Sequence, residues 1–173
     1  MRVLIAACLF AAAGWSLAQH SPYAGQQERE IKGLSAKEIE QYRSGAGMGY
    51  AKAAELNHFP GPMHVLELGE KLHLSAEQKI AAQRLMESHK AEARVLGAKL
   101  VEAERALEAL FRGGSVSEKA LAEAVNNAAS VQGQYRLSHL ETHRRMRALL
   151  TDAQTARYDE LRGYTGAGAS HRH

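Results

Sequence analysis

The sequence has few of the residues that build sheets or cross-links. Cysteine occurs once, at Cys8, proline three times, and aromatic residues make up only 6% of the 173 residues. No stretch alternates apolar and polar residues as a strand would, and the abundant Ala, Glu, Leu, Lys, Arg and Gln favour helices. The sequence therefore predicts an all-α protein.

Residues 1–18 have the features of a secretory signal peptide. Arg2 precedes an apolar run that ends at Trp15, and small residues up to Ala18 predict a cut before Gln19. The run is shorter than the roughly 20 residues that span a bilayer, so we expect no stable membrane anchor after cleavage. The cut would also remove the single cysteine, which excludes disulfides from the mature chain. An exported, cysteine-free helical protein indicates the bacterial periplasm.

Charge and motifs exclude two broad function classes. The formal net charge is +3 and falls to about +2 once the leading segment with Arg2 is lost, which is too little for a nucleic-acid footprint. No serine or cysteine nucleophile arrangement, glycine-rich phosphate loop or carboxylate pair stands out. We expect neither nucleic-acid binding nor enzymatic activity.

The central part of the chain has the pattern of a long helical hairpin. Seam residues recur at alternating steps of four and three over residues 75–112 and 117–149, and Gly113 and Gly114 lie between the two arms. Two arms joined by so short a turn must pack antiparallel. The expected seam consists of Leu85, His89, Ala93, Leu96, Leu100, Ala103, Leu107 and Leu110 on the first arm and Leu121, Val125, Ala128, Gln132, Tyr135, His139, Thr142, Met146 and Leu149 on the second.

Helix starts are marked by a hydroxyl residue three positions before Glu or Gln, the capping-box pattern. This pattern predicts four starts, at residues 35–38, 75–78, 115–118 and 151–154. We expect a first helix from Ser35 towards Asn57 with a break near its glycines, a short helix from Pro62 to Leu72, and a last helix from Thr151 to about Arg162. The predicted organisation is a signal peptide (1–18), a polar N-terminal lead with one helix (19–57), a helical hairpin domain (58–163) and a flexible tail (164–173).

Histidines on the two arms form a candidate metal site. His89 and His139 each lie about 22 residues from the turn, roughly 33 Å along a helix, so they should face each other. His143 lies one turn beyond His139 on the same face, and His64 is a further candidate if the short helix folds back over the open end. Imidazoles so placed suit zinc, copper, nickel or cobalt. The alternative is that His139 is a polar seam residue and His143 a solvated one.

A hydrolytic zinc enzyme does not fit this spacing. Such enzymes place a glutamate directly after the first histidine or directly before the second, whereas Glu141 is two positions from each.

Basic residues gather at the end of the second arm. They are Arg136, Arg144, Arg145 and Arg147. One interpretation is that they are cations placed near a helix C-terminus, which the helix dipole favours. The other is a positive, partly apolar surface that attracts acidic or unfolding client proteins.

Two of the helix starts resemble a family motif. Residues 150–154 read Leu-Thr-Asp-Ala-Gln and match the Leu-Thr-x-x-Gln motif of the CpxP/Spy family of bacterial periplasmic stress proteins. Residues 74–78 read Leu-Ser-Ala-Glu-Gln, with serine in place of threonine. The resemblance covers roughly residues 60–163.

The resemblance implies a curved, often homodimeric helical cradle without catalytic activity. Members include ATP-independent chaperones that hold unfolding periplasmic proteins, repressors that act on envelope stress sensors, and metal-resistance proteins such as CnrX and ZraP. The paired N-terminal histidines of the metal sensor have no equivalent, since His58 and His64 are six positions apart. The lead through Asn57 also departs from the family. The resemblance favours a heavy-metal-resistance protein that binds a transition metal through hairpin histidines, or else a chaperone without a metal role.

Overall fold

The computed structural model describes residues 21–165, and within that range every regular element is helical. The predicted signal peptide and most of the predicted tail lie outside the described residues. Between residues 21 and 165, no helix has both the length and the apolar character needed to cross a bilayer. The helices are α1 (Ala36–Ser44), α2 (Lys52–Glu55), α3 (Pro62–Glu67), α4 (Ala76–Arg112), α5 (Glu118–Leu149) and α6 (Asp152–Arg162).

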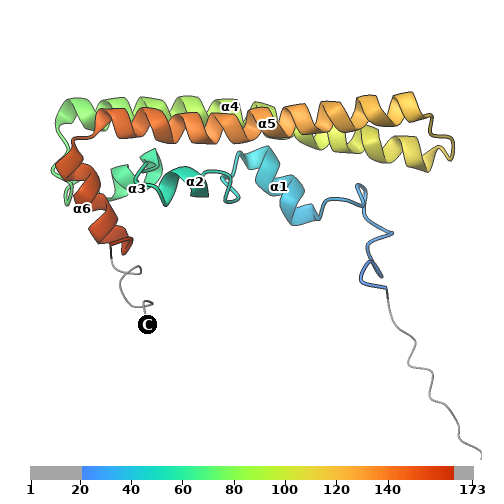
Figure 1. Ribbon diagram of the computed structural model, residues 1–173, viewed down its shortest axis with the longest axis horizontal. Helices are drawn as coiled ribbons and strands as arrows, with labels where there is room; N and C mark the ends of the chain where they lie inside the picture. The colour runs from blue at the N-terminus through green and yellow to red at the C-terminus, as the bar shows by residue number, and fades with distance from the viewer. Residues whose placement is uncertain (1–20, 166–173) are drawn as a thin grey trace, which may run out of the picture.

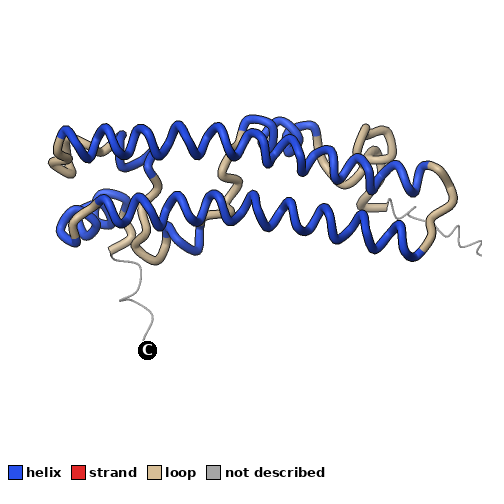
Figure 2. The backbone as a smooth tube through the Cα atoms, turned by 90° about the horizontal axis from the view of Figure 1, so that it is seen from above, coloured by secondary structure: helices blue, strands red, loops and turns tan. Residues whose placement is uncertain are grey.

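The predicted antiparallel hairpin is confirmed. Helices α4 and α5 run side by side along the length of the molecule and meet at the turn that contains Gly113 and Gly114 (Figures 1 and 2). Most seam positions are buried, but Val125 is 45% exposed and Gln132 is exposed as well. The seam is therefore less well buried towards the turn than at the open end.

Three of the four predicted capping boxes are present. Ser35, Ser75 and Thr151 each accept a hydrogen bond from the backbone N–H three residues on, and the side chain of that residue reaches back. The box predicted at residues 115–118 is wrong. Helix α5 is capped by Ser117, whose side chain accepts from the N–H of Ala120, and alanine has no side chain that could complete the box.

The two glutamines of the motif segments bind each other. Gln78 Nε2 donates to Gln154 Oε1 at 2.8 Å, and Gln154 Nε2 donates to Gln78 Oε1 at 3.0 Å. Gln78 also donates to the Leu149 carbonyl, and Gln154 to that of Leu72. Because an amide both donates and accepts, this pair joins the starts of α4 and α6 at the open end of the hairpin.

The helix predicted for the N-terminal lead is divided into α1 and α2, and the division lies at the glycines where a break was expected. Helix α1 ends at Gly45, whose φ of 72° is left-handed and whose N–H bonds back to the last turn of the helix. The chain resumes helical structure only at α2, and α3 ends at Glu67, five residues before the predicted Leu72. We call residues 31–67 the strap. It runs along one side of the hairpin, so that α1, α2 and α3 all lie beneath α4 and α5 in Figure 1.

The strap docks where α4 has no side chain. A Cβ added to Gly97 would lie 1.9 Å from the Tyr42 carbonyl oxygen at the end of α1. Glycine is therefore required for this close approach of backbone to helix. Tyr42 and Ile31 of the strap join one apolar cluster with Tyr135, and a second cluster fills the open end around Met146.

Candidate functional site

Between the two apolar clusters lies a pair of facing histidines. The rings of His89 on α4 and His139 on α5 meet edge to face, with centroids 4.5 Å apart, as the distance from the turn predicts. Tyr135 packs against His139 at 4.7 Å, and Tyr50 of the strap lies parallel to it at 6.3 Å. His139 is only 4% exposed. The pair is thus held on two packed helices, and aromatic rings shield His139.

Two ring nitrogens of this pair have no hydrogen-bond partner. His89 Nδ1 and His139 Nε2 are both buried and unpaired among the described residues. A third such atom, Asp159 Oδ1, belongs to a carboxylate whose other oxygen pairs with His58 at 2.6 Å. An unpaired buried polar atom costs about 1–3 kcal/mol. Two of them on facing imidazoles are an unusual cost, and a ligand that accepts a lone pair from each of these nitrogens would remove it.

Both histidines are held in the neutral form. Burial, followed by the proximity of His89 and His143, lowers the pKa of His139 to about 4. Burial, followed by the proximity of His143, also lowers the pKa of His89. Neutral imidazole is the form that offers a lone pair to a metal ion. The alternative, that His139 is simply a polar seam residue, explains its burial but not the unpaired nitrogen.

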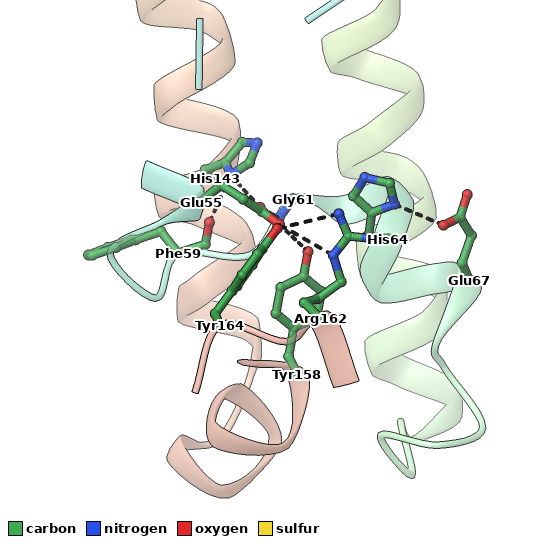
Figure 3. Close-up of polar contacts among 9 residues, drawn as sticks. All are labelled: Glu55, Phe59, Gly61, His64, Glu67, His143, Tyr158, Arg162 and Tyr164. Atoms are coloured by element: carbon green, nitrogen blue, oxygen red, sulfur yellow. Dashed lines mark hydrogen bonds and ion pairs between the residues drawn. The ribbon is translucent and has the colours of Figure 1, made fainter. Parts of the chain in front are cut away.

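His143 lies next to the pair and is anchored by the strap. Its Nδ1 is 2.7 Å from the carbonyl oxygen of Phe59 and 3.5 Å from Glu55 Oε2 (Figure 3). A carbonyl oxygen can only accept, so Nδ1 carries the proton and donates. The other ring nitrogen, Nε2, then has a free lone pair when the ring is neutral. His143 is therefore not a solvated surface residue.

Glu55 is the centre of a polar cluster that joins the strap to α5 and α6. Its Oε1 accepts from the hydroxyls of Tyr158 at 2.5 Å and Tyr164 at 3.0 Å, and Arg162 Nε lies 3.8 Å away. Its Oε2 accepts from the Gly61 N–H at 3.2 Å (Figure 3). Burial, together with the hydrogen bond to Glu55, raises the pKa of Tyr158. This carboxylate thus fixes the part of the strap that holds His143.

The remaining predicted site residue, His64, lies on α3 apart from the facing pair. Its Nδ1 bonds to Glu67 Oε2 at 2.8 Å within the same helix (Figure 3). Within residues 21–165, no group of three or more His, Cys, Asp or Glu side chains is already arranged to hold a metal ion. His89 and His139 face each other, and the rings of these two and of His143 would have to adjust before all three could bind one ion.

The four arginines proposed as a client surface differ in their contacts. Arg144 forms an ion pair with Glu141 at 2.6 Å, and Arg147 pairs with Asp152. Arg136 and Arg145 are exposed. A depression between α4 and α5 is lined by Arg84, Arg144 and Arg145 together with Leu85, Ala148 and Leu149. The sequence pattern predicted the arginines of α5, but it did not indicate that Arg84 of α4 lies beside them.

Sequence reasoning missed the strap residues of this site. Glu55, Phe59 and Tyr50 lie between 84 and 89 positions from the α5 histidines that they contact. Phe59 acts through its backbone carbonyl, which no side-chain pattern can identify. The only available signal was that Glu55 precedes a Pro-Gly-Pro turn that returns the chain towards the hairpin.

No family model, curated protein or solved structure matches this chain. The likeness of residues 74–78 and 150–154 to the Leu-Thr-x-x-Gln motif therefore stays a prediction.

Proposed function

We propose that this protein is a non-enzymatic transition-metal-binding protein, of the heavy-metal-resistance or stress type, that acts in the periplasm as a homodimer. The metal is bound by His89, His139 and His143. The observation that carries the proposal is the pair of buried, partnerless nitrogens on facing imidazoles. The rigid hairpin and the neutral state of both rings support it.

The chemistry of the donors limits the choice of metal. Three imidazole nitrogens without a thiolate suit zinc, copper(II), nickel or cobalt, and do not suit calcium or magnesium, which prefer oxygen. His64 lies apart from the facing pair, although its bond to Glu67 engages only Nδ1 and would leave Nε2 able to bind a metal ion. Metal binding would replace the two unsatisfied buried atoms with bonds and would tie α4 to α5 across the seam. The expected consequence is a stiffer hairpin with an altered dimer surface. An envelope sensor protein that contacts this surface would then respond to metal binding.

Metal titration of the mature chain tests this proposal. Zn²⁺, Cu²⁺, Ni²⁺ and Co²⁺ are each titrated into a protein that carries His171→Ala and His173→Ala, so that tail imidazoles do not contribute. Adding His89→Ala and His139→Ala should weaken binding by more than the roughly 10–100-fold typical of outer-shell changes. His73→Asn is the matched control, because His73 is exposed and its left-handed φ of 49° is tolerated by asparagine. Equal affinity in the His89/His139 variant and the control would refute the site.

A second candidate function is that of an ATP-independent chaperone for unfolding periplasmic proteins. The observation that favours it is the depression lined by Arg84, Arg144 and Arg145 together with apolar residues, because such a surface attracts acidic and apolar segments together. Excess protein should slow the aggregation of a denatured client at low salt, and Arg84→Ala with Arg145→Ala should weaken that effect. Unchanged client aggregation in the presence of excess wild-type protein would exclude this function.

A further inference from the structure

The strap reaches the histidine site through residues 50–61. Phe59 supplies a carbonyl to His143 Nδ1 at 2.7 Å, and Glu55 Oε2 lies 3.5 Å from the same nitrogen. Gly61 leaves room for the ring, since a Cβ there would lie 2.9 Å from both Cε1 and Nε2 of His143. Figure 3 shows these strap residues gathered around the imidazole, with the second ring nitrogen directed away from Phe59.

We propose that Glu55 is a positioning residue for metal binding. Together with the Phe59 carbonyl it holds the proton on Nδ1 of His143, so that Nε2 presents its lone pair to a divalent transition-metal ion shared with His89 and His139. This inference rests on the proposed metal-binding function and adds the outer shell of that site. It also gives the N-terminal lead a role, because the strap would complete the site that the hairpin begins.

The physical reason is the way imidazole ligands are oriented. A ring that binds metal through one nitrogen usually donates the N–H of its other nitrogen to a carbonyl or a carboxylate, which fixes its tautomer and raises its basicity. His143 Nδ1 donates to the Phe59 carbonyl, and the Glu55 carboxylate lies 3.5 Å from the same nitrogen without accepting a hydrogen bond from it. The hydrogen bond to Phe59 sets the direction of the ring, and the negative charge of Glu55 favours a proton on the near side.

Glu55 could instead serve only to hold the strap in place. It accepts from Tyr158, Tyr164 and the Gly61 N–H, so any change at Glu55 also weakens the contact with α6. Tyr158→Phe removes one of these bonds and does not touch His143. It is therefore the matched control for a purely structural role. Gly61→Ala is the converse variant, because its new Cβ pushes on the ring and leaves the carboxylate intact.

The experiment combines a tautomer measurement with a zinc titration. Nitrogen-15 NMR of the metal-free protein should show His143 protonated at Nδ1 and bare at Nε2. Glu55→Gln leaves the Phe59 carbonyl in place but removes the negative charge that favours a proton on Nδ1, so it should raise the population of the Nε2–H tautomer and weaken zinc binding by about 10–100-fold. Gly61→Ala should also weaken zinc binding, and Tyr158→Phe should leave both the tautomer and the affinity within about threefold of the wild type, well below the outer-shell effect.

The outcomes separate this inference from the proposed function. Zinc binding by a wild type whose metal-free His143 carries its proton on Nε2 would overturn the role of Glu55 and leave the metal site standing. The expected tautomers without zinc binding would refute the metal function, and with it the metal role of Glu55. Equal losses in Glu55→Gln and Tyr158→Phe would show that Glu55 acts only on strap stability, which would overturn the inference.

Discussion

Replacing Gly97 with alanine tests how the strap docks. In an ordinary helix interior this change stabilises by up to about 1 kcal/mol, because alanine is the better helix former. At Gly97 the new Cβ would lie 1.9 Å from the Tyr42 carbonyl oxygen and 2.6 Å from its carbonyl carbon. These are backbone atoms and cannot rotate away, so we expect α1 to leave α4.

The size of the effect follows from what the N-terminal part of the strap, Ile31 together with α1, buries. Tyr42 is 7% exposed and Ile31 1% exposed, and exposing each such side chain costs about 2 kcal/mol. With the gain in helix propensity subtracted, Gly97→Ala should lower the free energy of unfolding by about 3 kcal/mol. Urea unfolding followed by circular dichroism measures this loss, and hydrogen exchange of the α1 amides shows whether the strap has detached.

Gly133 on α5 provides the control. A Cβ there would meet nothing within 4 Å, so Gly133→Ala should stabilise by up to about 1 kcal/mol. Opposite signs for the two substitutions are the signature of strap docking at Gly97. If Gly97→Ala stabilised the protein as Gly133→Ala does, with α1 still protected from exchange, the docking argument would be refuted.

Two further predictions concern protonation and the open end of the hairpin. The folded-state pKa of His139 is lowered from 6.5 to about 4, so the stability that its neutral ring contributes is complete above pH 6.5 and is lost as the pH falls towards 4, up to about 3 kcal/mol. In urea unfolding at pH 7.5 and 4.5, His139→Leu should therefore lose less stability on acidification than the wild type. An equal loss in both proteins would count against a neutral buried ring. Gln154→Glu removes the donor to Gln78 and Leu72 and should lower the free energy of unfolding by about 1–2 kcal/mol. Gln78→Glu combined with Gln154→Glu should lower it at pH 7 by more than the sum of the two single changes, and part of this loss should be recovered at pH 4. Strictly additive shifts in thermal unfolding would contradict the paired-amide arrangement.

Local sequence signals predicted the helices well where a cap or a period was present. Ser75 and Thr151 were identified as caps because a hydroxyl and an amide three residues apart satisfy two free backbone donors. The same rule failed at Ser115, because two hydroxyl residues compete there and the capping residue is Ser117. The break predicted near the glycines of the lead is present, because Gly45 adopts a left-handed conformation that ends α1 before the chain resumes as α2.

The candidate site was predictable only in part. The facing of His89 and His139 follows from helix rise and a short turn, which are properties of the backbone and not of particular neighbours. The anchoring of His143 by a carbonyl and a carboxylate could not be predicted in this way. The strap has no continuous period that would indicate its path across the hairpin, and a backbone carbonyl leaves no trace in a residue pattern.

The sequence by itself determined the two long helices, because periodicity and capping depend on residues only a few positions apart. It also determined their antiparallel pairing and the facing of two imidazoles, because helices joined by a short turn must pack antiparallel. Tertiary structure alone decided that the N-terminal segment lies against the hairpin, that Gly97 receives the end of α1, and that Glu55 reaches His143. These contacts join segments distant in the chain, and they form because apolar side chains such as Ile31 and Tyr42 gain more from burial than the connecting backbone loses in freedom.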